Sequence, residues 1–349
     1  MSKHLFTNVT VLDCSGDEPF RGEVLVDGNK IAEVGKEGES LQRDGAEIID
    51  GGDDTTLMPG LIESHAHLSI DNVDDLTALG RIPTEEHTLL TMHNARIYID
   101  HGFTSCISAA SAKPRLDVVI RNAIEKGEIP GPRLLAATPW LTVTSGLGDM
   151  RTLHMPEVKS MALMADGPEE YRRLIRELIR EGVDIIKLVI SGDTFVPHAG
   201  SDTTVMSEEE VAAAAEVARA HGKRLSAHAR SAESVKRCIR NGINMIYHAN
   251  YTDEETLDML EANKDWLFVS PNIGFTATAA CGGHGWFTEE QIKAMGFREE
   301  LDGATKGIRE LMKRGIRILG GGDYGFMITP HGQNARDIDH FIQHCGMTN

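Results

Sequence analysis

The chain has 349 residues, of which 41% are hydrophobic and 25% are charged, so it can bury the core of one large domain or of a large and a small one. Its formal net charge of −18 disfavours binding to nucleic-acid phosphates and to anionic membranes. Five scattered cysteines argue against a disulfide framework, and neither a signal peptide nor a run of about 18 apolar residues is visible, so we expect a cytoplasmic protein.

The first part of the chain, residues 1–58, is predicted to form a small β-sandwich module. Short segments rich in strand-forming residues alternate with turns at residues 5–12, 22–26, 30–35 and 47–50. Asp27-Gly28-Asn29 separates the second segment from the third. A hairpin turn is favoured there because glycine and asparagine accept a positive φ.

The remainder, residues 59–349, alternates between strand-like and helix-like segments. Helical periodicity is clearest at residues 168–182, 207–222, 231–242 and 253–264, and the second of these opens with a capping-box pattern of Ser207 and Glu210. The predicted strands are residues 61–68, 102–109, 133–140, 183–191, 224–230, 245–250, 266–273 and 316–324. Eight strands alternating with helices predict an α/β fold of the TIM-like (β/α)8 barrel type, with an open doubly wound sheet as the alternative.

Residue types that bind metals stand at or near the carboxyl ends of five of these strands, which is where barrel enzymes carry their active sites. They are His65 and His67 of strand one, Lys187 of strand four, His228 of strand five, His248 of strand six and Asp323 of strand eight. Alternate residues of a strand point the same way, so both histidines of strand one can face one point. Each residue alone has an ordinary structural explanation, but their occurrence at successive strand ends favours a metal site.

Two segments resemble the amidohydrolase superfamily. Residues 58–68, MPGLIESHAHL, resemble the PGxIDxHxH motif that opens the barrel in that superfamily, and the VLVDGNKIAEVG run resembles its small N-terminal sheet. The nearest likeness is to the imidazolonepropionase-related branch, which includes Xaa-Pro dipeptidase-like enzymes. Members usually continue beyond the helix after strand eight, so we expect the architecture to be incomplete where this chain ends at Asn349.

The resemblance implies a binuclear metal-dependent hydrolase that cleaves an amide C–N bond of a small substrate such as a dipeptide or an N-acyl amino acid. The implied cofactors are two divalent metal ions, expected to be zinc, and a metal-bridging hydroxide attacks the carbonyl carbon. Asp323 would act as the catalytic acid and base. The implied ligands are His65, His67 and Asp323 for the more buried ion, His228 and His248 for the other, and a carbamylated Lys187 between the two.

Three further residues are candidate substrate contacts. Arg230 lies two residues after His228 and suits a substrate carboxylate, although a surface arginine is the alternative. His154 belongs to the long loop at residues 142–166, and Tyr251 follows strand six.

Other functions remain open on this pattern. A cyclic-amide hydrolase or a phosphotriesterase-like enzyme could use the same residues, and a degenerate non-catalytic barrel is the non-enzyme alternative. Lys187 disfavours a single-metal deaminase. Relatives are often oligomers, so a homo-oligomer is compatible with the resemblance.

Overall fold

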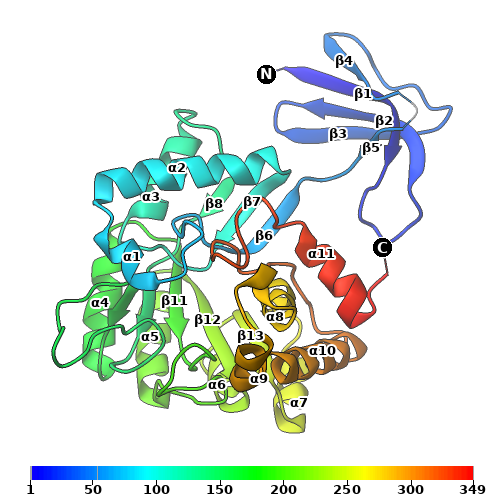
Figure 1. Ribbon diagram of the computed structural model, residues 1–349. Coiled ribbons are helices and arrows are strands. Elements are labelled where there is room, and N and C mark those ends of the chain that lie inside the picture. The colour runs from blue at the N-terminus through cyan, green and yellow to red at the C-terminus, as the bar shows by residue number, and fades with distance from the viewer. Residues whose placement is uncertain (1, 53, 349) are drawn as a thin grey trace. The chain divides into compact units, whose positions relative to one another are not determined.

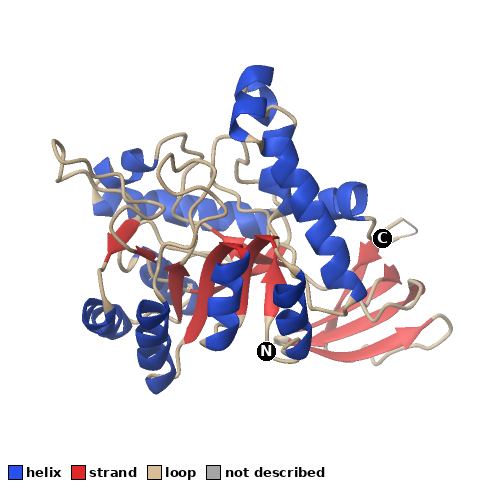
Figure 2. Cartoon of the chain, turned by 90° about the horizontal axis from the view of Figure 1, so that it is seen from below, coloured by secondary structure: helices blue, strands red, loops and turns tan. Residues whose placement is uncertain are grey.

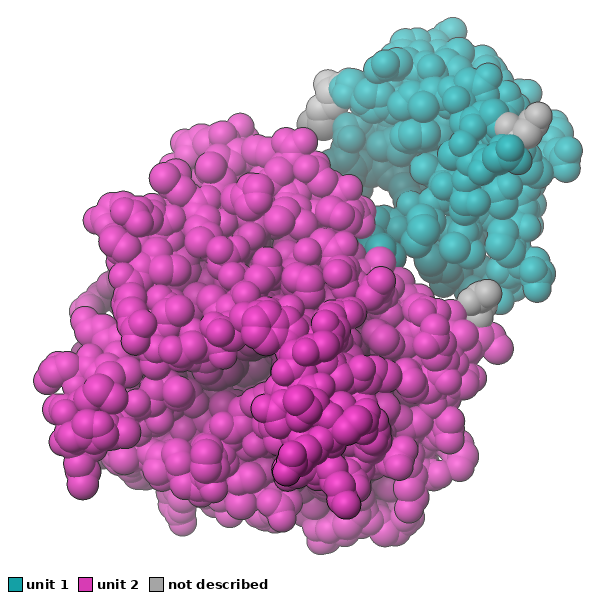
Figure 3. All heavy atoms as spheres, in the orientation of Figure 1, with its two compact units in different colours: residues 1–61 teal, residues 62–349 magenta. Residues whose placement is uncertain are grey.

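The computed structural model describes residues 2–52 and 54–348, and the chain divides into two compact units, Met1–Leu61 and Ile62–Asn349 (Figures 1 and 3). Within the described residues, no helix combines the length and the apolar character needed to cross a bilayer.

The first unit is built on one five-stranded sheet. Its strands are β1 (Lys3–Val11), β2 (Phe20–Asp27), β3 (Lys30–Lys36), β4 (Ala46–Asp50) and β5 (Thr56–Leu57). Their order is β3-β2-β1-β4, with β5 also beside β1. The predicted hairpin turn is confirmed, because Gly28 adopts a φ of 61° between β2 and β3. A second sheet, which the predicted sandwich would need, is not found among the described residues of this unit.

In the second unit, helices flank the strands (Figures 1 and 2). One sheet has the order β6-β7-β8, and the other has the order β10-β9-β11-β12-β13-β14, in which every neighbouring pair is parallel. The strands are β6 (Leu61–Ala66), β7 (Phe103–Ser108), β8 (Arg133–Leu135), β9 (Trp140–Thr142), β10 (Ala162–Met164), β11 (Ile185–Val189), β12 (Arg224–Ser231), β13 (Met245–Tyr251) and β14 (Phe268–Ser270).

The helices of this unit follow most of these strands in the chain. They are α1 (Leu76–Arg81), α2 (Thr84–Asp100), α3 (Leu116–Glu125), α4 (Pro168–Arg180), α5 (Glu208–Ala220), α6 (Ala232–Arg240), α7 (Glu254–Ala262), α8 (Ile273–Ala280), α9 (Glu289–Met295), α10 (Phe297–Lys313) and α11 (Arg336–His340), with the short helical turns η1 (Gly283–Gly285) and η2 (Phe341–Cys345). The predicted capping box is confirmed at the start of α5, where Ser207 and Glu210 bond to each other's backbone N–H.

The predicted barrel strands are confirmed for β6, β7, β11, β12, β13 and β14, but two predictions are wrong in detail. Residues 133–140 do not form one strand, because β8 pairs with β7 and β9 pairs with β11. Pro139, which has no N–H to donate, lies at this break. Residues 316–324 pair with β14 through the isolated bridge between Val269 and Ile318. The three glycines at positions 320–322 favour this loss of strand structure.

The two sheets are therefore not joined into a closed barrel by continuous strand pairing. Short contacts connect their edges. Residues 136–138 and residues 184–185 exchange backbone hydrogen bonds, and the Ser64 N–H donates to the Gly320 carbonyl at 3.3 Å. The second unit is an α/β fold with parallel strands at its centre.

Side chains on strand β11 alternate between the hydrophobic core and the opposite face of the sheet. Ile186 and Leu188 join the hydrophobic core together with Ile175 of α4 and Ala214 of α5. Because successive side chains of a strand point to opposite faces, Lys187 faces away from this core. The same alternation turns His228 away from Ala227 and Ala229, which belong to that core.

Candidate metal centre

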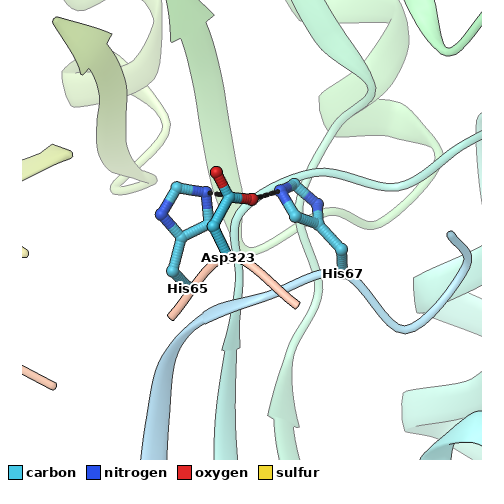
Figure 4. A group of neighbouring side chains, drawn as sticks. All are labelled: His65, His67 and Asp323. Atoms are coloured by element: carbon cyan, nitrogen blue, oxygen red, sulfur yellow. Dashed lines mark ion pairs between the residues drawn. The ribbon is translucent and has the colours of Figure 1, made fainter. Parts of the chain in front are cut away.

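The side chains of His65, His67 and Asp323 converge in the interior of the second unit (Figure 4). Asp323 Oδ1 lies 3.4 Å from His65 Nε2 and 3.1 Å from His67 Nε2. Neither Asp323 Oδ1 nor His67 Nε2 has a hydrogen-bond partner among the described residues, although both are buried. Such atoms are costly to leave unpaired. Two ligand atoms held by one zinc ion at about 2.1 Å would be about 3.4 Å apart, so this group fits a divalent metal ion.

The strand and the loop that carry these residues explain their convergence. His65 and His67 are alternate residues at the end of β6, and the prediction that both imidazoles face one point is confirmed. His67 Nδ1 lies 3.3 Å from the Ala110 carbonyl oxygen, which leaves Nε2 directed at Asp323. Asp323 adopts a left-handed φ of 59° after its glycine run.

His228 and His248 lie beside this group but are not part of it. Within the described residues, the ligand atoms that lie within 4.8 Å of one another come from His65, His67 and Asp323. The His248 ring centroid is 4.4 Å from that of His228 and 5.4 Å from that of His65. The four histidines that the sequence predicts at the site therefore form one cluster of rings: His65, His67, His228 and His248.

An unusual backbone turn brings His248 to this cluster. Tyr247 is the register partner of His228, so regular alternation would place Tyr247, and not His248, on the face of His228. His248 and Ala249 instead adopt left-handed φ values of 74° and 54°. Non-glycine residues rarely adopt this conformation, which costs on the order of 1–3 kcal/mol and is typical of functional sites.

Lys187 is buried next to these rings, with 1% of its surface exposed. Its Nζ lies 4.1 Å from the centroid of the Tyr247 ring. Burial lowers the pKa of Lys187 to about 7, while the charge of Asp323 acts in the opposite direction. A substantial share of this amine is therefore neutral and nucleophilic near neutral pH.

The electrostatics of the site favour the ligand forms that bind metals. Burial lowers the pKa of His228 to about 3 and places the pKa values of His65 and His248 well below the usual value. Burial alone would raise the pKa of Asp323, but its basic neighbours hold it below the usual value. Neutral imidazoles and an ionised carboxylate are the forms that coordinate divalent metals.

A cavity of about 460 Å³ reaches the site, and His228, Asp323 and Arg230 are among the residues that line it. The guanidinium of Arg230 is held by two buried carboxylates: Nε donates to Asp193 Oδ2 at 2.8 Å, and Nη1 donates to Glu300. The residue is thus part of the cavity wall and not a surface arginine.

The other two predicted substrate contacts lie elsewhere. His154 and Tyr251 are exposed side chains, and neither is found among the described residues that line the cavity.

Several buried groups of the site were missed by the sequence analysis. Glu63 accepts hydrogen bonds from the His65 N–H at 2.9 Å and from Asn334 Nδ2 at 3.0 Å, and burial raises its pKa to about 8. Its place two residues before His65 was an available signal. Asp193 lies two residues after the predicted strand at residues 183–191, which was also an available signal. Glu300 reaches Arg230 from α10, and no local pattern connects those two residues.

Asp337 of α11 holds the backbone of the strand-eight segment. Its Oδ1 accepts from the Gly274 N–H and its Oδ2 from the Gly321 N–H, both at 2.9 Å. We expect Asp337→Ala to lower the free energy of unfolding by about 2–4 kcal/mol, because two buried N–H groups lose their acceptor. Urea denaturation measures this change. Asp339→Ala, which removes an exposed carboxylate of the same helix, should change it by less than about 0.5 kcal/mol, and equal losses would contradict the assignment.

Comparisons with known proteins agree with this arrangement. The profile described as "Amidohydrolase family" matches residues 56–329. The ochratoxinase of Aspergillus niger is 27% identical over 350 residues, which cover 95% of this chain and 70% of the relative. A solved Xaa-Pro dipeptidase with methionine bound in its active site is 24% identical, with a TM-score of 0.85 over 99% of this chain and 84% of that one. A prolidase complexed with N-methylphosphonate-L-proline is 23% identical, with the same TM-score and the same coverage of both chains.

Proposed function

Because the chain belongs to the amidohydrolase family, and is thus a metal-dependent enzyme acting on C–N bonds, we propose that it hydrolyses the amide of a small substrate such as a dipeptide or an N-acyl amino acid. The observation that carries this proposal is the convergence of His65, His67 and Asp323 beside a cavity of about 460 Å³. A cavity of this size is typical of sites for small molecules. The dipeptidase and prolidase neighbours support the choice of substrate class.

Two divalent metal ions, for which zinc is the first choice, would be held by the six predicted ligands. His65, His67 and Asp323 would hold one ion, and His228 and His248 the other. When bound, such a pair polarises the carbonyl group and lowers the pKa of water. The neutral form of the imidazoles described above supports this role.

Lys187 would supply the ligand shared by the two ions. Its neutral Nζ attacks the carbon of CO2, a C–N bond forms and one proton is released, which leaves an anionic carbamate. This reaction needs the free amine, and a pKa of about 7 supplies it. It also replaces a buried cation, which would repel metal ions, by an oxygen ligand of negative charge.

Asp323 would move the proton of the reaction. Its carboxylate accepts a proton from the attacking water and delivers that proton to the leaving nitrogen of the amide. Its position between the two histidines and on the cavity wall supports this role.

Arg230 would orient the substrate. Its guanidinium donates to Asp193, Asn250 and Glu300 through Nε and Nη1. Within the described part of the chain, Nη2 therefore remains to donate to a carboxylate or carbonyl oxygen of a substrate in the cavity that Arg230 lines. The positions of His154 and Tyr251 give these two residues no comparable support.

We also propose that eight segments form the barrel of the family, namely β6, β7, β8, β11, β12, β13, β14 and residues 316–324. The bridges of Ala137 to Ile185 and of Val269 to Ile318 support this arrangement at the points where the ladders are interrupted.

Metal removal tests the proposed function. Protein purified without chelators should contain about two transition-metal ions per chain by elemental analysis. We expect dialysis against a chelator to abolish hydrolysis of dipeptides and N-acyl amino acids, and zinc with bicarbonate to restore it. His65→Asn should lose metal and activity, whereas His221→Asn, at an exposed histidine, should keep both. Undiminished hydrolysis by metal-free protein would overturn the proposal.

A further inference from the structure

Aromatic side chains concentrate around the cavity that reaches the candidate metal centre. The chain has ten phenylalanines, three tryptophans and five tyrosines. Six of these line the cavity: Trp140, Phe195, Phe275, Trp286, Phe287 and Phe326. One third of all aromatic residues thus gathers at a single site.

These rings form a continuous series that begins at the metal centre. Phe326 lies 6.0 Å from the ring centroid of His67, and Phe275 lies 5.6 Å from Phe326. Phe195 follows at 5.9 Å from Phe275, and Phe287 at 6.4 Å from Phe195. These separations are in the range of favourable aromatic contacts, so the series presents a connected aromatic wall.

Part of the aromatic cavity lining is left uncovered. Phe195 of the wall is 43% exposed, and Trp286, which also lines the cavity, is 55% exposed. Large apolar side chains gain by leaving water, and contiguous exposed apolar surface in a concave site marks a place where a ligand binds. A structural role in the core would instead bury both side chains.

The loop that carries Trp286 has a defined shape. The four residues before it, at positions 282–285, adopt positive φ values of 91°, 55°, 59° and 92°. A Cβ on Gly283 would lie 2.8 Å from a methyl carbon of Ile328, so a larger residue cannot occupy this position without a shift. Trp286 therefore enters the cavity lining directly after a turn whose shape favours glycine.

We propose that the cavity binds substrates in which the amide carries a large planar aromatic group, and that Phe326, Phe275 and Phe195 with Trp286 form the subsite for that group. This inference rests on the proposed amide hydrolysis and names the substrate class. Planar rings can stack on or pack edge-on against this wall while the amide reaches Asp323. Small aliphatic amides would leave the wall uncovered.

Matched substrates test the inference. N-(2-naphthoyl)-L-alanine is compared with N-acetyl-L-alanine, and N-acetyl-naphthylalanine with N-acetyl-L-alanine, so that the ring is tried on either side of the amide. We expect kcat/KM to be about 10- to 150-fold higher for the aromatic member of at least one pair, which is the gain expected from burying an aromatic group of this size.

Trp286→Ala should lower the ratio of kcat/KM between the aromatic and the non-aromatic member of that pair at least about fivefold, mainly through KM. Trp266→Ala, at a tryptophan that does not line the cavity among the described residues, should leave the ratio unchanged.

Binding of 2-naphthoate, measured by calorimetry, separates the two proposals. Equal kcat/KM for aromatic and acetyl substrates, or an unchanged ratio in both Trp286→Ala and Phe195→Leu, would overturn the aromatic subsite while amide hydrolysis stands. Naphthoate binding that Trp286→Ala weakens, in a metal-loaded protein that hydrolyses none of the amides, would support the subsite and overturn the proposed function.

Discussion

Alanine in place of Lys187 is expected to lower kcat/KM for amide hydrolysis by more than about 1,000-fold, because the proposed carbamate ligand cannot form. Elemental analysis should show the metal content falling from about two ions per chain to one or none. The side chain lies in the interior beside Tyr247, so no surface group can take its place. Steady-state kinetics with added zinc and bicarbonate measures the loss.

Two controls distinguish a lost ligand from a damaged fold. Lys126→Ala, at an exposed lysine of the same unit, should keep full activity. Lys187→Ala should still unfold in one cooperative transition, with a free energy of unfolding lowered by about 2–5 kcal/mol, because a cavity forms and Asp323 loses a positive neighbour. Short carboxylates such as propionate should restore part of the activity by supplying an oxygen ligand in the vacated space. Full activity of the variant without such addition would contradict the bridging role.

Asparagine in place of Asp323 is expected to lower kcat by about 100- to 10,000-fold. The substitution keeps the size of the side chain but removes the basic oxygen that would carry the proton between water and the leaving nitrogen. It also removes the negative charge between His65 and His67, so elemental analysis should show weaker retention of one metal ion.

Asp74→Asn is the matched control for this change. Asp74 lines the same cavity but is exposed and lies outside the cluster of metal-ligand candidates. Its substitution should change kcat by less than about tenfold. If Asp323→Asn lost no more activity than Asp74→Asn, the proton-transfer role would have to be assigned to another group.

Local sequence patterns were sufficient for much of the strand framework. Alternation correctly placed His65 and His67 on one face, and residues 183–191 were correctly predicted to contain a strand that carries Lys187. These inferences depend on residues within one strand, where the period of two is fixed by the backbone. The family resemblance, confirmed by the profile match over residues 56–329, added the order of the ligands.

The parts that could not be predicted depend on tertiary context. His248 faces the site through left-handed residues at the end of β13, and no propensity of a histidine or an alanine indicates that turn. Glu300 lies 70 residues from Arg230 in the chain, and only the folded position of α10 brings them together. The aromatic wall likewise joins α8 to three separate loops, each of which contributes one or two rings.

The metal-ligand candidates and the aromatic wall belong to different kinds of backbone. The candidate ligands stand at β6, β11, β12, β13 and the segment after residue 316, and all of these except β6 contribute their reverse sides to the hydrophobic core. Most of the wall stands on connections, including the turn that presents Trp286. Substitutions, insertions or deletions in those connections can alter the accepted substrate without disturbing the reaction chemistry. Homologous enzymes could therefore differ in the substrates that they accept while keeping the same catalytic residues.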